Sequence, residues 1–231
     1  MFTTSVCFQS NHTGDLNIKA TCSNIESSSV QIEDCYLYDV SSQSGLSHFG
    51  NVYEINGSGK NQASITYDST EQAYKIISTG DGLKTIPITS ATGKDQLKIT
   101  LDMKPTSTDL QYQTGIMCIG TNHSASGVVF GNYSGFYNPT FLNNDWNNNE
   151  NLTGSWSSGT WYNVEMTVNG TSVSIVVKNG STTVASTTFD LTDKSSTLFN
   201  TLTDRQYGFA IGWKANSTLY SYAKNIKIKS L

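Results

Sequence analysis

The sequence predicts an all-β protein in which two antiparallel sheets pack face to face. Most segments that are rich in apolar residues alternate apolar with polar positions, as expected of strands with one buried face. Asn-Gly pairs at 169–170 and 179–180 supply the backbone conformation that tight hairpin turns need. About ten such segments follow at short spacing after residue 51, which favours a sandwich, and only 192–202 has the pattern of a helical turn or two.

The clearest pair of strands covers 161–178. One face of its first strand carries Tyr162, Val164, Met166 and Val168. The return strand repeats the pattern with Val173, Ile175 and Val177 after the Asn-Gly turn. This segment predicts a half-buried hairpin with a second turn behind it.

The other strands are expected, in chain order, at 4–9, 16–22, 30–40, 63–67, 74–78, 96–104, 115–119, 127–130, 183–190, 207–213 and 221–229. A Ser/Gly-rich stretch over 41–50 breaks the pattern. We therefore assign 1–45 to an N-terminal β segment, 46–50 to a linker and 51–231 to the main domain. Three strands cannot form a stable sandwich alone. Residues 1–45 are thus the end of an upstream domain, strands added to the main sandwich, or strands that pair with another copy.

The composition excludes some partners. Only 14% of residues are charged, the net charge is −4, and Arg205 is the one arginine, so we expect no nucleic acid binding. No apolar run approaches the roughly 20 residues that span a bilayer, and we expect no membrane insertion. The opening residues have neither the basic nor the apolar region of a signal peptide.

Cysteine and histidine show no metal-binding spacing. Cys7, Cys22, Cys35 and Cys118 lack a paired C-x-x-C pattern, and His12, His48 and His123 are scattered. Buried free thiols are the favoured interpretation. A disulfide between Cys22 and Cys35, across neighbouring strands, is the alternative.

Residues 51–231 resemble the concanavalin A-like (laminin G-like) jelly roll. The resemblance depends on Trp161-Tyr162-x-Val164 before the Asn-Gly hairpin, and on the closing runs 207–213 and 222–228. It implies an all-β, two-sheet antiparallel jelly-roll sandwich. This fold serves lectins, glycan-binding modules, glycosidases, adhesion domains and virion proteins, so the resemblance alone does not define a function.

The N-terminal segment resembles the last strands of a carbohydrate-binding-module jelly roll. Gly14–Ile18 and Val30–Asp39 carry that resemblance. Asp34 and Asp39, with Glu33, are candidate calcium ligands because calcium favours clustered carboxylates. A solvated strand face is the alternative interpretation.

One known catalytic pattern can be compared with this sequence. Laminarinase-type glycosidases of the resembled fold carry an E-x-D-x-x-E pattern on one strand, which places two carboxylates about 5 Å apart. This chain lacks that pattern, and the strand residues Asp102 and Glu165 stand singly. We therefore expect the protein not to be an enzyme, with a glycoside hydrolase as the catalytic alternative.

Aromatic and amide residues concentrate between 132 and 161. Sugars stack their C–H faces on aromatic rings and pair their hydroxyls with amides and carboxylates. The segment thus predicts a glycan-binding loop, with Asp145 also a candidate calcium ligand. The predicted ligand-binding residues are Tyr133, Tyr137, Asn143, Asn144, Asp145, Trp146, Asn147, Asn149 and Trp156. Alternatively Phe136, Phe141 and Trp161 are core residues and the Asn run is a solvated turn.

These features predict a non-catalytic carbohydrate-binding or adhesion module on an extracellular surface or a virion, such as a fibre. Its expected partner is a glycan or a glycosylated surface receptor. We also expect assembly into a homo-oligomer or a larger virion or surface structure, and no cofactor other than calcium. The alternative on the same fold is a structural virion or surface protein that uses the jelly roll for subunit contacts.

Overall fold

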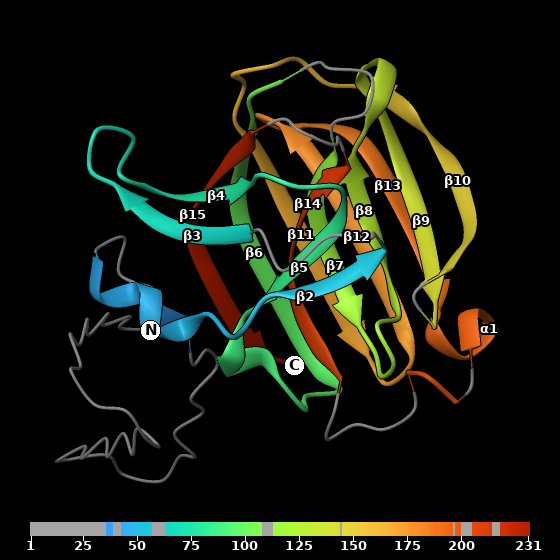
Figure 1. Ribbon diagram of the computed structural model, residues 1–231. Helices are drawn as coiled ribbons and strands as arrows, with labels where there is room; N and C mark the ends of the chain where they lie inside the picture. Colours follow the sequence, from blue (N-terminus) through green and yellow to red (C-terminus); the bar gives the residue numbers. More distant parts are fainter. Residues whose placement is uncertain are drawn as a thin grey trace, which may run out of the picture. The chain divides into compact units, whose positions relative to one another are not determined.

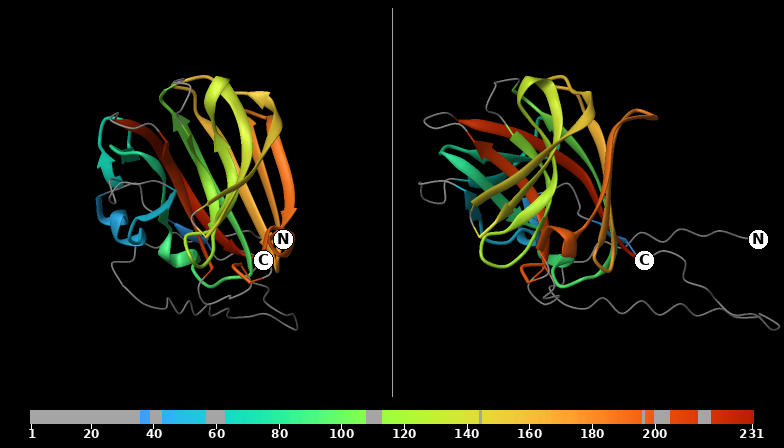
Figure 2. Two further views of the ribbon diagram at one scale, coloured as in Figure 1. Left: turned by 45° about the vertical axis from the view of Figure 1, so that its right-hand side comes forward. Right: turned by 90° about the vertical axis from the view of Figure 1, so that its right-hand side faces the viewer.

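The computed structural model shows two stacked β-sheets, which Figure 1 shows from one face and Figure 2 from the side. It describes residues 36–38, 43–56, 63–107, 113–143, 145–195, 197–199, 205–213 and 218–231. These described residues all belong to one compact unit. The predicted all-β antiparallel sandwich is confirmed.

The sheet nearer the viewer in Figure 1, here the front sheet, has the strand order β10-β9-β8-β7-β14-β5-β2. Its neighbouring strands are antiparallel. The strands are β2 (Tyr53–Asn56), β5 (Gly82–Pro87), β7 (Gln113–Ile119), β8 (Ala125–Phe130), β9 (Gly135–Leu142), β10 (Asp145–Ser155) and β14 (Gln206–Trp213).

The back sheet has the order β13-β12-β11-β6-β15-β4-β3, and β1 also pairs with β15. Its strands are β1 (Tyr36–Tyr38), β3 (Ala63–Asp68), β4 (Ala73–Ser78), β6 (Gln96–Pro105), β11 (Tyr162–Asn169), β12 (Ser172–Asn179), β13 (Thr182–Asp190) and β15 (Leu219–Ser230). The described helices are short: η1 (Gln43–His48), η2 (Thr89–Ala91), η3 (Asn132–Ser134) and α1 (Leu191–Ser195).

The main core lies between the sheets. The predicted inward face of β11 is confirmed, because its four apolar residues are at most 3% exposed. Met166 lies opposite Ile99 of β6 and Ile175 of β12, so the alternation of three neighbouring strands fills one layer. Each such side chain contributes about 1.5–3 kcal/mol by its burial.

A second buried cluster lies on the outer face of the front sheet. It consists of Ile55, Leu83, Met117, Ala125, Val129, Phe141 and Ala210, with Tyr137 packed against it. The front sheet is therefore apolar on both faces over much of its area, and its outer face differs from the polar outer face of the back sheet.

The predicted loop between 132 and 161 is instead largely the β9–β10 hairpin. Asp145 lies opposite Leu142, and the pairing continues to Ser155 opposite Gly135. The prediction missed β10 because its residues are mostly exposed and show no apolar alternation. An edge strand needs no apolar face of its own when β9 provides its backbone hydrogen bonds.

Parts of the N-terminal segment and linker join this unit. Within the predicted strand 30–40, residues 36–38 form β1 and pair with Lys227–Lys229. Phe49, in the predicted linker, packs edge-on against Tyr74 with ring centroids 5.0 Å apart. The expected strands 4–9 and 16–22 lie outside the described residues, as do Asp34, Asp39, Cys7, Cys22 and Cys35.

Candidate functional site

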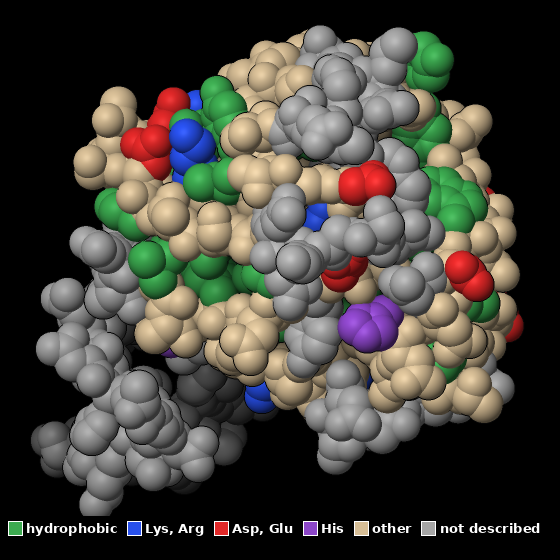
Figure 3. All heavy atoms as spheres, viewed as in Figure 1, with side chains coloured by type: hydrophobic (Ala, Val, Ile, Leu, Met, Phe, Trp, Pro, Cys, Tyr) green, Lys and Arg blue, Asp and Glu red, His purple; other side chains and the backbone are tan. Residues whose placement is uncertain are grey.

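The outer face of the front sheet carries exposed rings and amides along β9 and β10. Cross-strand pairing aligns Ala125, Phe141 and Trp146 in one row. A second row aligns Val129, Tyr137 and Asn151. We call Tyr133, Tyr137, Trp146, Asn149 and Asn151 the aromatic–amide surface. In Figure 3, which views this face, hydrophobic and uncharged side chains predominate among the coloured atoms.

Trp146 has an accessible ring at one end of this surface. Its side chain is 40% exposed, and its ring meets that of Phe141 edge-on at 4.9 Å. The contact with a buried ring fixes the orientation of the indole. A fixed, exposed indole is a platform on which the C–H face of a sugar can stack.

Tyr137 and Tyr133 lie toward the other end. The Tyr137 hydroxyl donates to the carbonyl of Asn132 at 3.1 Å, and its ring lies close over Gly131. Any Cβ at Gly131 would come within 2.4 Å of that ring. Tyr133 is 73% exposed and has a left-handed backbone (φ 53°), which is uncommon outside glycine. At about 3.3 Å per residue, the four residues of β9 from Tyr137 to Phe141, opposite Trp146, separate these two rings by roughly 13 Å.

Asn149 adds a side-chain amide whose oxygen lacks a hydrogen-bond donor among the described residues. It lies opposite Pro139, which has no backbone N–H to donate. Its carboxamide oxygen is buried and has no hydrogen-bond partner within the described structure. Buried acceptors are rarely left unpaired, so this oxygen calls for a donor from outside the described chain.

The turn that carries His123 is joined to the turn that carries Asn143 at the Trp146 end. The backbone N–H of Asn143, in the β9–β10 turn, donates to the hydroxyl of Ser124 at 2.9 Å, and this joins it to the β7–β8 turn. His123, next to Ser124, and Asn143 both have left-handed backbones, with φ of 56° and 52°. Strained residues of this kind collect at functional sites. His123 was not a predicted site residue, because only the pairing of distant strands brings it to this end.

The structure places the predicted site residues in different environments. Tyr133, Tyr137, Trp146 and Asn149 lie on the surface described above, and Asn143, Asp145 and Asn147 are exposed near its Trp146 end. Asn144 lies outside the described residues. Trp156 corrects the prediction, because it is only 3% exposed and its indole N–H donates to the carbonyls of Gly131 and Gly135, each at 3.0 Å. Packed on Phe130, Trp156 is a core residue and not a ligand platform.

The described residues form neither a metal-ligand cluster nor a membrane-spanning helix. Across the described ranges, no three His, Cys, Asp or Glu side chains gather as metal ligands would, so Asp145 has no such partners there. The described part of the chain has no helix with the length and apolar character to cross a membrane.

The two strand carboxylates that stand singly in the sequence are neighbours in the back sheet. Asp102 lies opposite Asn163, two residues before Glu165 on β11. Hydrogen bonds from Lys178 and Lys98 lower the pKa of Glu165. Glu165 is therefore ionised at neutral pH, and this pair lacks the raised-pKa acid that glycoside hydrolysis requires on that residue.

No protein-family model matches this chain, and no curated protein matches it in sequence. Solved structures match in fold. A functionally unknown protein from Saccharomyces cerevisiae aligns over 80% of this chain and 98% of its own, with a TM-score of 0.56 and 11% identity. Alginate lyase A1-II′ aligns over 80% of this chain and 96% of its own, with a TM-score of 0.52 and 13% identity. The GH43 protein BlXynB from Bacillus licheniformis aligns over 73% of this chain but 35% of its own, with a TM-score of 0.53 and 11% identity.

These matches establish the fold, which is the concanavalin A-like jelly roll. They overturn the expectations of a non-catalytic module and of a protein that is not an enzyme, because glycan-active enzymes stand among the matched structures. The expectation was wrong because the E-x-D-x-x-E pattern tests for one glycosidase family only. That pattern does not test for a lyase, and a lyase is among the matched structures. Virion, tail-fibre and adhesion roles find no support among these matches.

Proposed function

We propose that the protein is a polysaccharide-cleaving enzyme that holds its substrate along the aromatic–amide surface. The observation that carries the proposal is the exposed, fixed ring of Trp146 on the same face as Tyr137 and a row of amides. A span of about 13 Å between the Tyr137 and Trp146 rows suits more than one consecutive sugar unit of an extended chain. Rings contribute affinity and amides orient the hydroxyls.

Cleavage needs a group that transfers a proton. In hydrolysis an acid protonates the leaving oxygen, and in elimination a base removes a proton beside the sugar carboxylate. An imidazole can accept a proton at one ring nitrogen and donate one from the other, so His123 is the candidate for this role among the described residues at the Trp146 end. Asn143, held to the neighbouring turn through Ser124, offers an amide that can orient the reacting sugar. The matched alginate lyase and GH43 protein support a glycan-active role.

The test is a panel of alginate, xylan and polygalacturonate incubated with the full chain. New reducing ends report cleavage, and the ultraviolet absorbance of a new double bond separates elimination from hydrolysis. His123→Ala should lower the rate at least about a hundredfold. The matched His48→Ala, in η1, should leave it unchanged.

Trp146 is tested on the same substrate. Trp146→Ala should raise KM about tenfold or more, whereas Trp146→Phe, which keeps a ring, should retain most of the affinity. If none of the polysaccharides in the panel gains new reducing ends, the proposal is overturned. So would an equal effect of His123→Ala and His48→Ala.

A further inference from the structure

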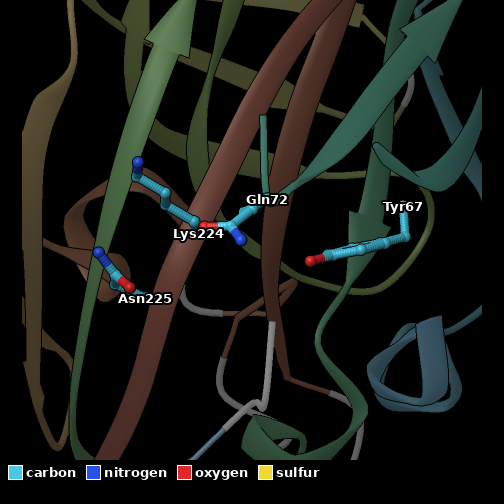
Figure 4. A pocket seen from close by; sticks show the side chains of 4 residues that line it. All are labelled: Tyr67, Gln72, Lys224 and Asn225. Carbon is cyan, nitrogen blue, oxygen red and sulfur yellow. The ribbon is translucent and has the colours of Figure 1, made fainter. Parts of the chain in front are cut away.

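A polar hollow of about 260 Å³ opens at a gap in the back sheet (Figure 4). It is lined by Tyr67, Gln72, Lys224 and Asn225. Along one edge of β15, pairing with β4 ends at Ala223, and pairing with β1 begins only at Lys227. The described strands therefore leave a break in the ladder at this edge. On its other edge, β15 shifts register against β6 between Lys224 and Lys227.

The lining offers both donors and acceptors. The amide nitrogen of Asn225 donates to Asp102 at 2.6 Å, which leaves the oxygen of that amide to accept. Figure 4 shows the Tyr67 hydroxyl on the side opposite Asn225, with the Gln72 amide between them beside the stem of Lys224, whose ammonium points away from Tyr67. Gln72 and Asn225 both have left-handed backbones, with φ of 49° and 54°, so the two flanks of the hollow hold unfavourable conformations.

Beside the hollow, lysines alternate with aromatic rings across the sheet. Tyr222 lies opposite Lys75 on β4 and opposite Lys104 on β6. The Lys104 ammonium lies 4.7 Å from the Tyr222 ring centre and 5.1 Å from that of Trp161. The Lys224 ammonium lies 4.1 Å from the Trp161 ring centre. We call Lys75, Tyr222, Lys104, Trp161 and Lys224 the lysine–aromatic row.

The rings hold two of these cations without neutralising them. Lys104 is paired with Glu71 at 2.5 Å. Lys75 and Lys224 make no ion pair within the described residues, and they lie over Tyr220 and Trp161 instead, at 4.3 and 4.1 Å from the ring centres. A ring face attracts a cation but leaves its full charge in place. Both ammonium groups are thus held in position and available to an anion.

The surrounding face has an excess of positive charge, although the whole chain is acidic. The outward positions of β4, β6, β11 and β15 carry six lysines but two carboxylates; these are Lys75, Lys98, Lys104, Lys224, Lys227 and Lys229 against Asp102 and Glu165. Asp68 and Glu71 of the β3–β4 turn reduce this excess without cancelling it. Asp102 is occupied by the amides of Asn163 and Asn225, at 3.1 and 2.6 Å. A negatively charged ligand is therefore favoured here.

We propose that the hollow and the lysine–aromatic row bind one carboxylate-bearing sugar unit of an anionic polysaccharide. Lys224 pairs with the carboxylate, and Tyr67, Gln72 and the Asn225 oxygen pair with hydroxyls. An inorganic anion is disfavoured because it would face the Asn225 oxygen, another acceptor. The volume is below the roughly 300–1,000 Å³ of pockets that enclose drug-sized ligands, which suits a single sugar unit. This site lies on the opposite sheet from the aromatic–amide surface.

Binding of galacturonate trimer to the full chain, measured by calorimetry and by amide chemical shifts, tests the proposal. The fully methyl-esterified trimer is the matched ligand that lacks charge. The native chain should bind the acid form at least about tenfold more tightly than the ester. Lys224→Gln should weaken binding of the acid form about tenfold, whereas Lys94→Gln, the same change on an exposed loop, should not alter it.

Three results would overturn the proposal: equal affinity for acid and ester, equal effects of the two lysine substitutions, or complete competition by inorganic sulfate, which would show an unspecific anion site. The test is separate from that of the proposed function. Trp146→Ala should leave this binding intact, and Lys224→Gln should leave cleavage of a neutral xylan intact.

Discussion

The guanidinium of Arg205 donates two hydrogen bonds to the carbonyl oxygen of Phe199, at 3.0 Å from Nε and 2.7 Å from one terminal nitrogen. Its other terminal nitrogen donates to the carbonyl of Gly170 at 2.6 Å, in the turn between β11 and β12. The side chain is 1% exposed. The one arginine of the chain therefore joins the segment after α1 to the most clearly predicted hairpin.

Arg205→Lys should destabilise the fold by about 2–4 kcal/mol, because a single ammonium cannot reach both carbonyls and a buried charge would lose partners. Urea unfolding followed by circular dichroism measures this loss. Lys94→Arg, on an exposed loop, is the control and should change stability by less than about 0.5 kcal/mol. A loss below about 1 kcal/mol for Arg205→Lys would show that these hydrogen bonds contribute little.

Substitution of Trp156 should mainly lower stability, whereas substitution of Trp146 should mainly impair glycan binding. Trp156→Ala should cost about 3–5 kcal/mol in stability, because it empties a core site and removes the indole N–H that donates to the carbonyls of Gly131 and Gly135. Trp146→Ala should cost about 1 kcal/mol or less while impairing glycan binding. Thermal unfolding of both variants, alongside the cleavage assay, separates the two roles. Equal destabilisation by the two would contradict the assignment of Trp146 to a binding surface.

Glu165 should make stability depend on pH in the acid range. Hydrogen bonds from Lys178 and Lys98, at 2.7 and 2.8 Å, lower its pKa below the usual 4.5. A carboxyl whose pKa is lowered by folding stabilises the fold above its unfolded pKa, and this contribution is lost as pH falls through the folded pKa. Glu165→Gln should therefore cost about 1 kcal/mol or less of unfolding free energy at neutral pH, since Glu165 and its lysine partners are partly exposed. It should cost nothing at a pH low enough to protonate Glu165 in both the folded and the unfolded chain.

Unfolding free energies of the native chain and Glu165→Gln, compared from pH 7 to pH 2, check this. The two curves should converge as pH falls below 4.5. Glu150→Gln serves as the control, because Glu150 is 51% exposed and its contacts are long, at 3.4 Å with Lys194 and 3.5 Å with the amide of Asn148. A difference for Glu165→Gln that stays constant or grows in acid would refute the expected linkage.

Cys118 should be chemically inert in the folded chain. It is a buried free thiol, and burial raises its pKa to about 12, so the reactive thiolate is scarce at neutral pH. In a variant with Cys7, Cys22 and Cys35 replaced by Ser, iodoacetamide at pH 8 should label Cys118 only after denaturant is added. Mass spectrometry reads the labelling. Rapid labelling without denaturant would mean that this part of the front sheet opens readily.

Local patterns were sufficient for much of the fold. β11 and β12 match their predicted positions because alternation and the Asn169-Gly170 turn depend on residues a few positions apart. β10 could not be predicted in this way, since its exposed residues show no apolar period and its hydrogen bonds come from β9. The sequence signal for strands is the burial of one face, and β10 lacks it.

The candidate site, like the fold, could be predicted from the sequence only in part. An aromatic and amide-rich segment marked the region of Tyr137 and Trp146, but it did not distinguish Trp146 from Trp156, because both have polar neighbours in the sequence. Only the packing of Trp156 on Phe130 makes it a core residue. The lysine–aromatic row was missed because its members come from β4, β6 and β15 and from the residue before β11.

By itself, the sequence determined that the chain forms two facing sheets and where its hairpins turn, because those features depend on neighbouring residues. Tertiary structure alone decided that Ser124 bonds to Asn143, that Lys224 lies over Trp161, and that one tryptophan is buried while another is exposed. These relationships depend on strand order and register, which join residues far apart in the chain. A period-two pattern specifies the face on which a side chain lies but not its neighbour across the sheet.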